Sequence, residues 1–342
     1  MASWTPSVVS LASDAERVVL GHRLVDDYLE VVRARCRRNT LWATAYDLKV
    51  FFTVVGKDPV EVTVADVLGF IRSQRGVDAA TVVRLADGGS GLALSTVRRR
   101  LSSVSGFYGY LTVVGVVEVN PVLRGMTART VSGRVRRRAP LVRQVRRLPQ
   151  VLVPEEVNAL LGGLRRWRDR AMIEAMLLGG LRRSEVLGLR LEDLRSAERR
   201  VFVVDGKGGH QRWVPISPRF FMSVTDYLHR ERPVDTVTDR VFVVLKGPHR
   251  GQPLTAKGLE QIMRDARRRA GLDRGTCHEL RHTCLTRLRE AGMALEAIQA
   301  QAGHRSIEST RLYLHLADGW VAAEYRKAAE AIDAQARAGS GS

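Results

Sequence analysis

The segment from residue 124 to residue 149 divides the chain, because it has several arginines, no acidic residue and no clear hydrophobic period. Such a composition is typical of a linker between domains rather than of a packed element. The chain has 342 residues, enough for two domains of ordinary size. We therefore expect a first domain at 14–123, a basic linker at 124–149, a second domain at 150–337 and a flexible tail at 338–342.

The charge balance points to a polyanionic partner. Lys and Arg total 55 against 36 Asp and Glu, which gives a formal net charge of +19. Nucleic acid is the favoured partner, although an anionic membrane or an arginine-rich proteome would also explain the excess. Within the linker, Arg136, Arg137 and Arg138 are candidate DNA-binding residues, because uncompensated arginines repel one another without an anionic partner. A solvated tether is the alternative interpretation of this segment.

The sequence also favours a protein of the cytoplasm. Cys36, Cys277 and Cys284 form no CxxC pair and no even set, so a disulfide framework is not expected. The first residues lack the pattern of a signal peptide, and no apolar run reaches the roughly 18 residues of a membrane span. We therefore expect no membrane association.

Hydrophobic spacing of three and four residues predicts a helical first domain. The expected helices cover residues 24–36, 40–56, 64–76 and 94–115, with a loop at 76–93. Thr63 and Asp66 have the spacing of a capping box at the third of these helices. Arg98, Arg99 and Arg100 point in three directions around the fourth, so at least one must be exposed and available to DNA.

The second domain is predicted to be mostly helical with a small antiparallel sheet. Pro154 suits the first turn of its first helix, and two acidic residues follow it. Residues 199–206 and 212–217 alternate in polarity around the turn KGGHQ and predict a β-hairpin. Residues 240–244 predict a further short strand, and the chain is then helical to its end. The expected fold class is mainly α, with one helical-bundle domain and one mixed domain.

Two histidines and an arginine share one helix face near the C-terminal end. His278, Arg281 and His282 stand at positions i, i+3 and i+4. The segment HELRH matches the zinc motif H-E-x-x-H, with Glu279 in the general-base position. A guanidinium on that face would repel a dication, and no third ligand follows at a familiar spacing, so an anion suits the face better. Structural histidines on an amphipathic helix are the remaining alternative.

Four further residues carry weak signals when each is taken alone. Arg182 follows two glycines at a junction between helices, and Lys207 lies in the glycine-rich hairpin turn. His304 lies in a turn after Gly303, where a helix is expected to end. Tyr313 lies two turns into the next predicted helix, where a tyrosine is usually packing.

Together these residues resemble the signature of the tyrosine recombinases, also called the phage integrase family, of the Xer-like or simple integrase type. The ordered set is Arg182, Lys207, His278, Arg281, His304 and Tyr313. GLRRSEVLGLRLEDL resembles the family's first box, and HELRHTCLTRLREAG with QAGHRSIESTRLYLH resembles its second. The hairpin turn departs from the pattern, because His210 and Gln211 stand where a further lysine is often found. That departure leaves Lys207 as the candidate.

The resemblance implies a DNA strand transferase with a helical core-binding domain and a catalytic domain. It implies cleavage through a 3′-phosphotyrosine, without metal or cofactor, on double-stranded recombination sites. It also implies a homotetramer on DNA, with a free monomer or weak oligomer, acting on the nucleoid in the cytoplasm. Integration, transposition and resolution stay open as biological roles. The last helix, near residues 320–337, is expected to pack on its own domain or on a neighbouring subunit.

Each residue of the set has a role that suits this reaction. Tyr313 is the expected nucleophile, and its hydroxyl has a pKa near ~10, so it needs a base. His278 is the expected general base and Lys207 the expected general acid. Arg182 and Arg281 would clamp the phosphate oxygens, and His304 would donate to them. Glu185 and His282 would not contact the phosphate but would orient the catalytic side chains that do.

Three other classes of protein remain open at this point. One is a zinc hydrolase built on the HELRH segment, which would lose activity with a chelator. A type IB topoisomerase uses the same chemistry but relaxes DNA without a partner site. A non-catalytic DNA-binding protein would share the positive charge, but it would not need the ordered set of catalytic residues.

Overall fold

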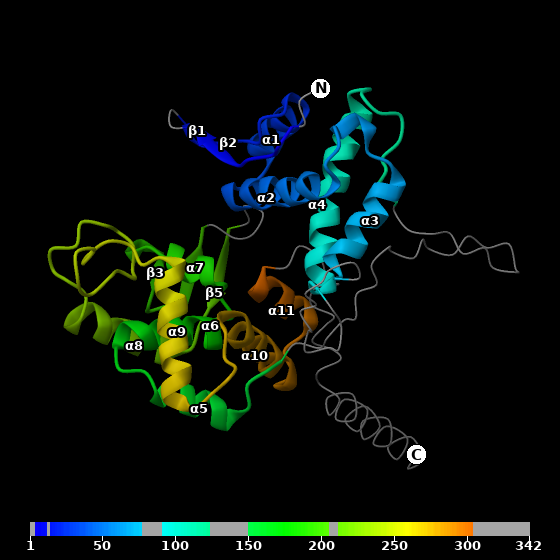
Figure 1. Cartoon of the computed structure of the whole chain (residues 1–342). Coiled ribbons are helices and arrows are strands. Elements are labelled where there is room, and N and C mark those ends of the chain that lie inside the picture. The colour runs from blue at the N-terminus through cyan, green and yellow to red at the C-terminus, as the bar shows by residue number, and fades with distance from the viewer. Residues whose placement is uncertain (1–3, 12–13, 77–90, 124–149, 205–210, 304–342) are drawn as a thin grey trace, which may run out of the picture. The chain divides into compact units, whose positions relative to one another are not determined.

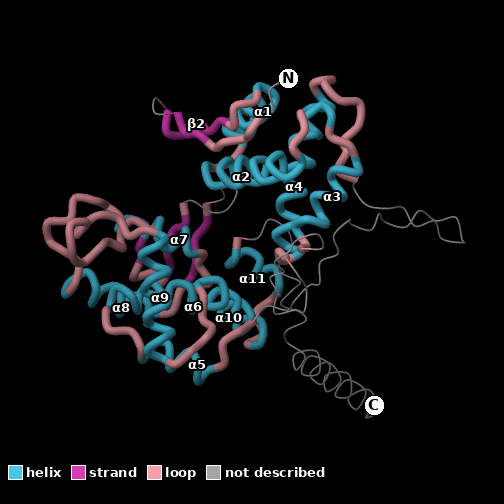
Figure 2. The backbone as a smooth tube through the Cα atoms, in the orientation of Figure 1, coloured by secondary structure: helices cyan, strands magenta, loops and turns pink. Residues whose placement is uncertain are grey.

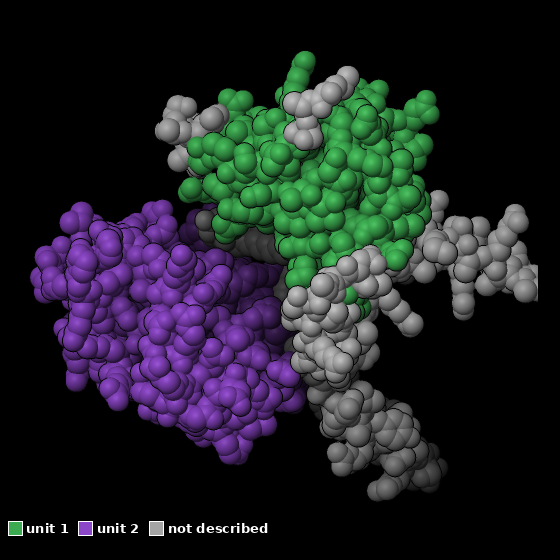
Figure 3. Space-filling model, in the orientation of Figure 1, with its two compact units in different colours: residues 1–146 green, residues 147–342 purple. Residues whose placement is uncertain are grey.

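The chain forms two compact units, residues 1–146 and residues 147–342 (Figure 3). The computed structural model describes residues 4–11, 14–76, 91–123, 150–204 and 211–303. Each unit has a hydrophobic core of its own. The boundary falls within the arginine-rich segment, whose residues 124–149, Arg136, Arg137 and Arg138 included, lie outside the described ranges.

Unit 1 begins with an antiparallel hairpin, in which β1 (Val9–Leu11) pairs with β2 (Asp14–Val19). We expected a helical pattern from residue 14 onward, and this expectation is wrong for β2. Val18 and Leu20 are both buried and lie two residues apart, which is the period of a strand rather than a helix. The carboxylate of Asp26 accepts a hydrogen bond from the backbone N–H of Leu20 at 2.6 Å, so the following helix holds the end of the strand.

Four helices follow in the described part of unit 1, close to the predicted positions. They are α1 (Arg23–Arg35), α2 (Arg38–Val55), α3 (Val64–Gln74) and α4 (Leu94–Val113) (Figure 1). Aromatic rings join them in the core, where Phe52 meets Phe107 at 5.7 Å and Phe51 meets Phe70 at 5.0 Å, both edge to face. Helices α2, α3 and α4 therefore share one aromatic core.

The predicted capping box of α3 is confirmed. The Thr63 hydroxyl accepts from the backbone N–H of Asp66 at 3.4 Å, and the Asp66 carboxylate accepts from the backbone N–H of Thr63 at 2.8 Å. Lys57 donates to the same carboxylate at 3.0 Å. These contacts, with the Lys57 hydrogen bond the largest, lower the pKa of Asp66 to about 2, so the cap is charged at neutral pH.

Unit 2 is built around α6 (Trp167–Gly179), which is buried on almost every side. Helices α8 and α10 pack on it, and Met172 and Met176 at its centre have no exposed surface. The other helices of the described part are α5 (Pro154–Gly162), α7 (Arg183–Gly188), α8 (Pro218–Arg230), α9 (Ala256–Ala270), α10 (Cys277–Glu290) and α11 (Leu295–Ala302). Pro154 opens α5 as predicted, whereas α8 was not predicted.

A three-stranded antiparallel sheet completes unit 2 (Figure 2). Its strands are β3 (Leu194–Arg195), β4 (Arg200–Val203) and β5 (Arg212–Pro215), in the order β3-β4-β5. The predicted hairpin is confirmed by the pairing of β4 with β5, in which Val201 stands opposite Val214 and both are buried. The last pair of this ladder joins Val203 to Arg212, and Lys207 stands between these two residues in the sequence.

The strand predicted at residues 240–244 is wrong. The segment makes only isolated bridges, because its backbone groups bond to partners from several elements. The Tyr227 hydroxyl donates to the Val241 carbonyl at 3.0 Å and accepts from the Val243 N–H at 3.2 Å. Arg168 Nη1 donates to the Val243 carbonyl at 2.9 Å. Side chains thus satisfy part of this buried backbone, and backbone groups of Leu189, Gln252 and Leu254 bond to the rest of it.

The cysteines are free thiols, as expected from their number and spacing. Cys36 is exposed, Cys277 is half-buried and Cys284 is buried. Burial raises the pKa of the Cys284 thiol to about 12, so this thiol is protonated at neutral pH. Within the described ranges, no helix is both long enough and apolar enough to cross a lipid bilayer.

Candidate active site

Arg182 lies between two helices of unit 2, where the chain turns sharply. The glycines predicted to end a helix here do so, because α6 ends at Gly179 and Gly180 adopts a left-handed backbone with φ of 66°. A Cβ at Gly180 would be strained and would lie 3.2 Å from the side chain of Leu285. Arg182 then forms the N-cap of α7, and its guanidinium reaches the Glu185 carboxylate one turn later.

The Glu185 carboxylate is the centre of the site, and its side chain has no exposed surface. Arg182 donates to it from the backbone N–H at 2.8 Å and from Nη1 at 2.7 Å. Arg212 makes a two-pronged contact, with Nη1 and Nη2 at 3.1 and 3.0 Å from the two oxygens. Arg281 Nη1 lies 4.0 Å from Oε2 of the same carboxylate. One acid therefore gathers three arginines, from the N-cap of α7, from β5 and from α10.

The charge of this cluster favours an anion. Burial by itself raises the pKa of Glu185, but the hydrogen bonds and charges of Arg212 and Arg182 outweigh it and hold that pKa below its usual value. The carboxylate is therefore ionised at neutral pH. Three guanidinium charges against one carboxylate leave a positive excess, which is the charge that a phosphate group requires.

The C-terminal end of α11 is the second partner of the same three arginines. Its last carbonyls have no partner within the helix and carry the negative end of the helix dipole. Arg212 Nε donates to the backbone carbonyl of Gln301 at 3.1 Å. Arg281 Nη2 donates to the backbone carbonyl of Ala302 at 2.7 Å, and Arg182 Nη2 donates to that of Gly303 at 3.2 Å. The cluster therefore fixes the end of α11, directly before His304.

Arg281 is the most deeply buried of the three, with 4% of its side chain exposed. Its Nη1 donates to the carbonyl of Gly180 and its Nη2 to that of Ala302. The guanidinium thus joins the turn after α6 to the end of α11. Because both Nη atoms are bound to backbone carbonyls, the guanidinium group is held in a single orientation. A flexible lysine side chain would not maintain such an orientation.

Arg212 was not among the predicted site residues, although the sequence holds a signal for it. Arg212, Val214 and Ile216 alternate along the chain from β5, and Val214 and Ile216 are buried in the core. An arginine at the inward-facing end of this alternation must meet a buried acid or carbonyl groups. Here it meets both, in Glu185 and in the end of α11.

Gln301 was also not predicted, and it locks α11 against the rest of the unit. Its Nε2 donates to the Gly179 carbonyl and to the Pro215 carbonyl, each at 3.0 Å. The side chain is buried. One amide thus ties the end of α11 to the end of α6 and to β5, the same elements that the arginine cluster joins.

His278 and His282 lie in contact on α10, as their spacing predicted. Their Nε2 atoms are 2.8 Å apart and their rings meet edge to face with centroids 4.2 Å apart. Burial, then the charge of Arg281, lowers the pKa of His278. Burial, then His278 itself, lowers the pKa of His282 to about 4. His278 is therefore a neutral imidazole at neutral pH, which is the form that can accept a proton.

Glu279 has a structural role that the zinc-like motif did not suggest. Its Oε2 accepts from the backbone N–H groups of Gly275 and Thr276 at 2.8 and 2.6 Å, and the Thr276 hydroxyl accepts from the Glu279 N–H. This is a capping box, and the spacing Thr-x-x-Glu could have indicated it. In the part of the chain that the structure describes, no group of three or more His, Cys, Asp or Glu side chains could hold a metal ion.

Three of the predicted catalytic residues, Lys207, His304 and Tyr313, lie outside the described residues. The described residues end at Val204 and resume at Gln211, with Lys207 between them. They end again at Gly303, directly before His304. Among the predicted residues, the structure brings together Arg182, Glu185 and Arg281 in one cluster, with the His278–His282 pair on the same helix as Arg281.

The predicted DNA-binding arginines of α4 belong to unit 1. Arg98 is exposed, as at least one of the three had to be. Arg99 Nη1 lies 2.5 Å from the carboxylate of Asp47, whose side chain is 2% exposed, while half of the Arg99 side chain remains exposed. Arg100 is mostly covered and donates to Gln74. The buried Asp47 therefore holds Arg99 at the surface with its charge still accessible.

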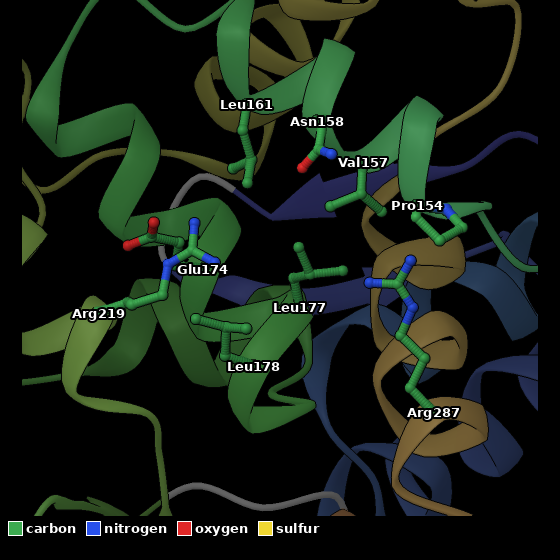
Figure 4. Close-up of a pocket in the computed structure, with 9 residues that line it drawn as sticks. All are labelled: Pro154, Val157, Asn158, Leu161, Glu174, Leu177, Leu178, Arg219 and Arg287. Atoms are coloured by element: carbon green, nitrogen blue, oxygen red, sulfur yellow. The ribbon is translucent and has the colours of Figure 1, made fainter. Parts of the chain in front are cut away.

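A small pocket of about 100 Å³ lies elsewhere in unit 2 (Figure 4). Its lining includes Glu174 and Arg219 on one side and Arg287 on the other. Burial raises the pKa of Glu174, and one of its carboxylate oxygens has no hydrogen-bond partner. None of the residues of the arginine cluster lines this pocket.

Known proteins are similar to this chain in sequence and in fold. The sequence model of the phage integrase family matches residues 150–319. Tyrosine recombinase XerC of Halalkalibacterium halodurans is 34% identical over 234 residues, which cover 66% of this chain and 72% of that protein. A tyrosine recombinase of Thermosipho africanus is 28% identical over 299 residues, covering 86% of this chain and 94% of that protein.

Solved structures agree in fold. The Tn1549 transposon integrase in complex with transposon right end DNA has a TM-score of 0.67 and 18% identity, covering 90% of this chain and 99% of that one. XerH site-specific recombinase in a post-cleavage complex has a TM-score of 0.62 and 20% identity, covering 86% and 82%. The matching family model and the recombinase relatives identify the chain as a DNA strand transferase. The chain belongs to the phage integrase family of tyrosine recombinases, as its sequence motifs had indicated.

Proposed function

We propose that this enzyme cuts and rejoins double-stranded DNA at specific sites, with Tyr313 as the nucleophile. The observation that carries the proposal is the cluster of Arg182 and Arg281 on the buried Glu185, with the end of α11 held directly before His304. A family match alone would give the class of enzyme. The cluster adds a preorganised positive site within unit 2, where a scissile phosphate can be bound.

The chemistry follows from the charge and the proton balance. The Tyr313 oxygen attacks the scissile phosphorus, and the bond from phosphorus to the 5′-oxygen breaks. A 3′-phosphotyrosine and a free 5′-hydroxyl result, and the reverse attack by a hydroxyl rejoins the strand. Ionising a tyrosine with a pKa near ~10 at neutral pH costs about 4 kcal/mol, so the proton must pass to a base as the attack proceeds.

His278 is the proposed base and Lys207 the proposed acid. His278 is neutral at neutral pH, because burial and the charge of Arg281 lower its pKa. Lys207 lies in the turn between β4 and β5 and would protonate the departing 5′-oxygen. Arg182 and Arg281 would hold the non-bridging oxygens, and His304 would donate to one of them. Glu185 orients the arginines and His282 orients His278.

The cleavage rate should depend on pH through His278. We expect the second-order rate constant for cleavage to rise as His278 loses its proton, with an inflection below the usual histidine pKa near 6.5. The rate constant should then stay level through neutral pH. The measurement is the rate of adduct formation at limiting DNA from about pH 5 to pH 9. An inflection above the usual histidine value, or one that persists in His278→Gln, contradicts the assignment.

The exposed arginines of unit 1 and the arginine-rich sequence of the linker support the same proposal. Arg98 and Arg99 are exposed on α4, and Arg136, Arg137 and Arg138 stand in the basic segment between the units. We propose that these arginines bind phosphates flanking the cleavage site. We also propose that the active form is a homotetramer on two DNA sites, that the free chain is a monomer or weak oligomer, and that it acts in the cytoplasm on the nucleoid.

The biological role that we propose is mobile-element integration, transposition or resolution. Relatives with the names XerC and XerD, and a structural neighbour that is a transposon integrase, fit this range. A type IB topoisomerase activity is the alternative, and it would relax plasmids without a preferred sequence. A protein that only binds DNA would form no covalent product.

One experiment tests these alternatives together. The chain is incubated with genomic DNA, covalent complexes are trapped with SDS, and the DNA attached to protein is sequenced. We expect adducts at one short recurring sequence, joined through a 3′-phosphate, in the presence or absence of a chelator. Adducts spread over unrelated sequences would favour the topoisomerase, and the absence of any adduct would contradict catalysis.

A further inference from the structure

Arg212 connects three parts of unit 2 that carry proposed catalytic groups. Its Nη1 and Nη2 donate to Glu185, which also binds Arg182. Its Nε donates to the carbonyl of Gln301 at 3.1 Å, near the end of α11. Its backbone pairs with Val203 in the last pair before the hairpin turn. All three kinds of contact come from one side chain and one backbone position.

Because Arg212 lies at the end of the β4–β5 hairpin, its contacts also fix the position of that end of the hairpin. Lys207 stands between the two residues of this pair in the sequence, so the chain on both sides of Lys207 is anchored wherever Arg212 is fixed. A short antiparallel hairpin is marginally stable by itself and can shift its register or tilt. The guanidinium of Arg212, with only 12% of its side chain exposed, holds this end of the hairpin against α7 and α11.

The contacts of Arg212 are also close-packed. Gly303 follows α11 with φ of 60°, and a Cβ at that position would lie 2.8 Å from Nη1 of Arg212. The guanidinium plane therefore lies directly against the backbone of Gly303. A side chain held on Glu185, on the Gln301 carbonyl and on a glycine backbone has little freedom to move.

We propose that Arg212 is a positioning residue for strand cleavage, which holds the ends of β4 and β5 on either side of Lys207 at a fixed place relative to Arg182 by binding both Glu185 and the end of α11. This inference rests on the proposed function, because it concerns the same reaction. Arg212 itself does not need to touch DNA. A displacement of about 1 Å of a reacting group lowers a rate by about 100-fold, so loss of this tie should slow the chemical step far more than DNA binding.

The test compares two DNA substrates under single-turnover conditions with saturating protein. One is the ordinary cleavage site, and the other has sulfur in place of the bridging 5′-oxygen. In the sulfur substrate the bond from phosphorus to sulfur breaks, and the thiolate leaves without a proton. A thiol has a pKa near ~8.5, against ~15.7 for water, so a sulfur leaving group makes a general acid unnecessary.

Arg212→Gln should cleave the ordinary DNA about 100-fold more slowly than the unaltered chain, with an unchanged dissociation constant for DNA. It should recover most of that loss on the sulfur substrate, as Lys207→Ala should. Arg212→Lys keeps the charge but cannot bind both Glu185 and the Gln301 carbonyl, so an intermediate rate with the same recovery is expected. If Arg212→Gln does not fold, Arg212→Lys provides the same comparison.

Arg250→Gln is the matched control. Arg250 also binds one carboxylate with short contacts, to Asp235 at 2.9 Å, but this pair lies on the surface away from the cluster. Its loss should leave both rates unchanged. Equal slowing of the Arg212 variants on both substrates, or normal cleavage of the ordinary DNA, would overturn the inference. Absence of any adduct with the unaltered chain would instead contradict the proposed function.

Discussion

Replacing Tyr313 by Phe should abolish the covalent protein–DNA adduct completely while leaving DNA affinity unchanged. The substitution removes one oxygen atom, the proposed attacking group, and keeps the aromatic ring. No phosphotyrosine can form without that oxygen, so the expected loss is total rather than partial. The measurement is an SDS gel with labelled DNA, beside a binding titration of the same variant.

Tyr46→Phe is the matched control for this experiment. Tyr46 is on α2 in unit 1, and its side chain is exposed. The control removes the same hydroxyl from the same residue type and should leave the adduct intact. Mass spectrometry of the peptide that carries the nucleotide should identify Tyr313 in the unaltered chain. An adduct that persists in Tyr313→Phe, or that maps to another tyrosine, would show that the nucleophile was assigned wrongly.

Local signals in the sequence predicted much of the fold correctly. The helices of unit 1, the capping box of Thr63 and Asp66, and the glycine ends of α6 and α11 depend on interactions within a few residues. Such interactions are readable from spacing alone. The hairpin of β4 and β5 was also predicted, because alternation on both sides of a glycine-rich turn is a short-range pattern.

The secondary-structure prediction was wrong at residues 240–244 and at the hairpin of β1 and β2. Residues 240–244 have the composition of a strand, yet the Tyr227 hydroxyl and Arg168 bind Val241 and Val243, and the other backbone hydrogen bonds go to several separate segments. The hairpin of β1 and β2 was missed because its short strands precede a long helical pattern. At residues 240–244 the deciding partners are tertiary contacts that no local period encodes, whereas Val18 and Leu20 do keep the two-residue period of a strand.

In the candidate site, too, the sequence predicted residues correctly but did not predict their tertiary contacts. Arg182, His278 and Arg281 were found from their order along the chain, and Glu185 and His282 were predicted to orient them, but the order did not show which side chains would meet. The structure places one carboxylate, Glu185, beneath Arg182 and Arg281, and it adds Arg212 from β5. A buried acid with three guanidinium partners explains how so many positive charges can be held together before DNA arrives.

The largest effect on the folded state is therefore expected for Glu185→Gln. Glutamine keeps the shape and an oxygen that can accept the backbone N–H of Arg182, but it removes the charge on which Arg182, Arg212 and Arg281 depend. Breaking a buried ion pair by neutralising one partner costs about 3–5 kcal/mol of the free energy of unfolding. For a unit of this size that is roughly a 6–20 °C fall in the melting temperature.

The pH dependence of this loss has a definite sign. The folded pKa of Glu185 lies below its unfolded value near 4.5, because the arginine contacts outweigh burial. The stabilisation from the charged form is therefore complete above the unfolded pKa and is lost as pH falls through the folded pKa. The difference in melting temperature between the unaltered chain and Glu185→Gln should be full at neutral pH and should shrink in acid.

Catalysis should fall in parallel, because the arginines lose the acid that orients them. We expect single-turnover cleavage by Glu185→Gln to fall by about 100-fold or more at a temperature where the variant is folded. Asp235→Asn is the control, since Asp235 binds Arg250 on the surface and its neutralisation should change neither property. If Glu185→Gln matched the unaltered chain in melting temperature and rate, Glu185 would not be the group that holds the arginine cluster together.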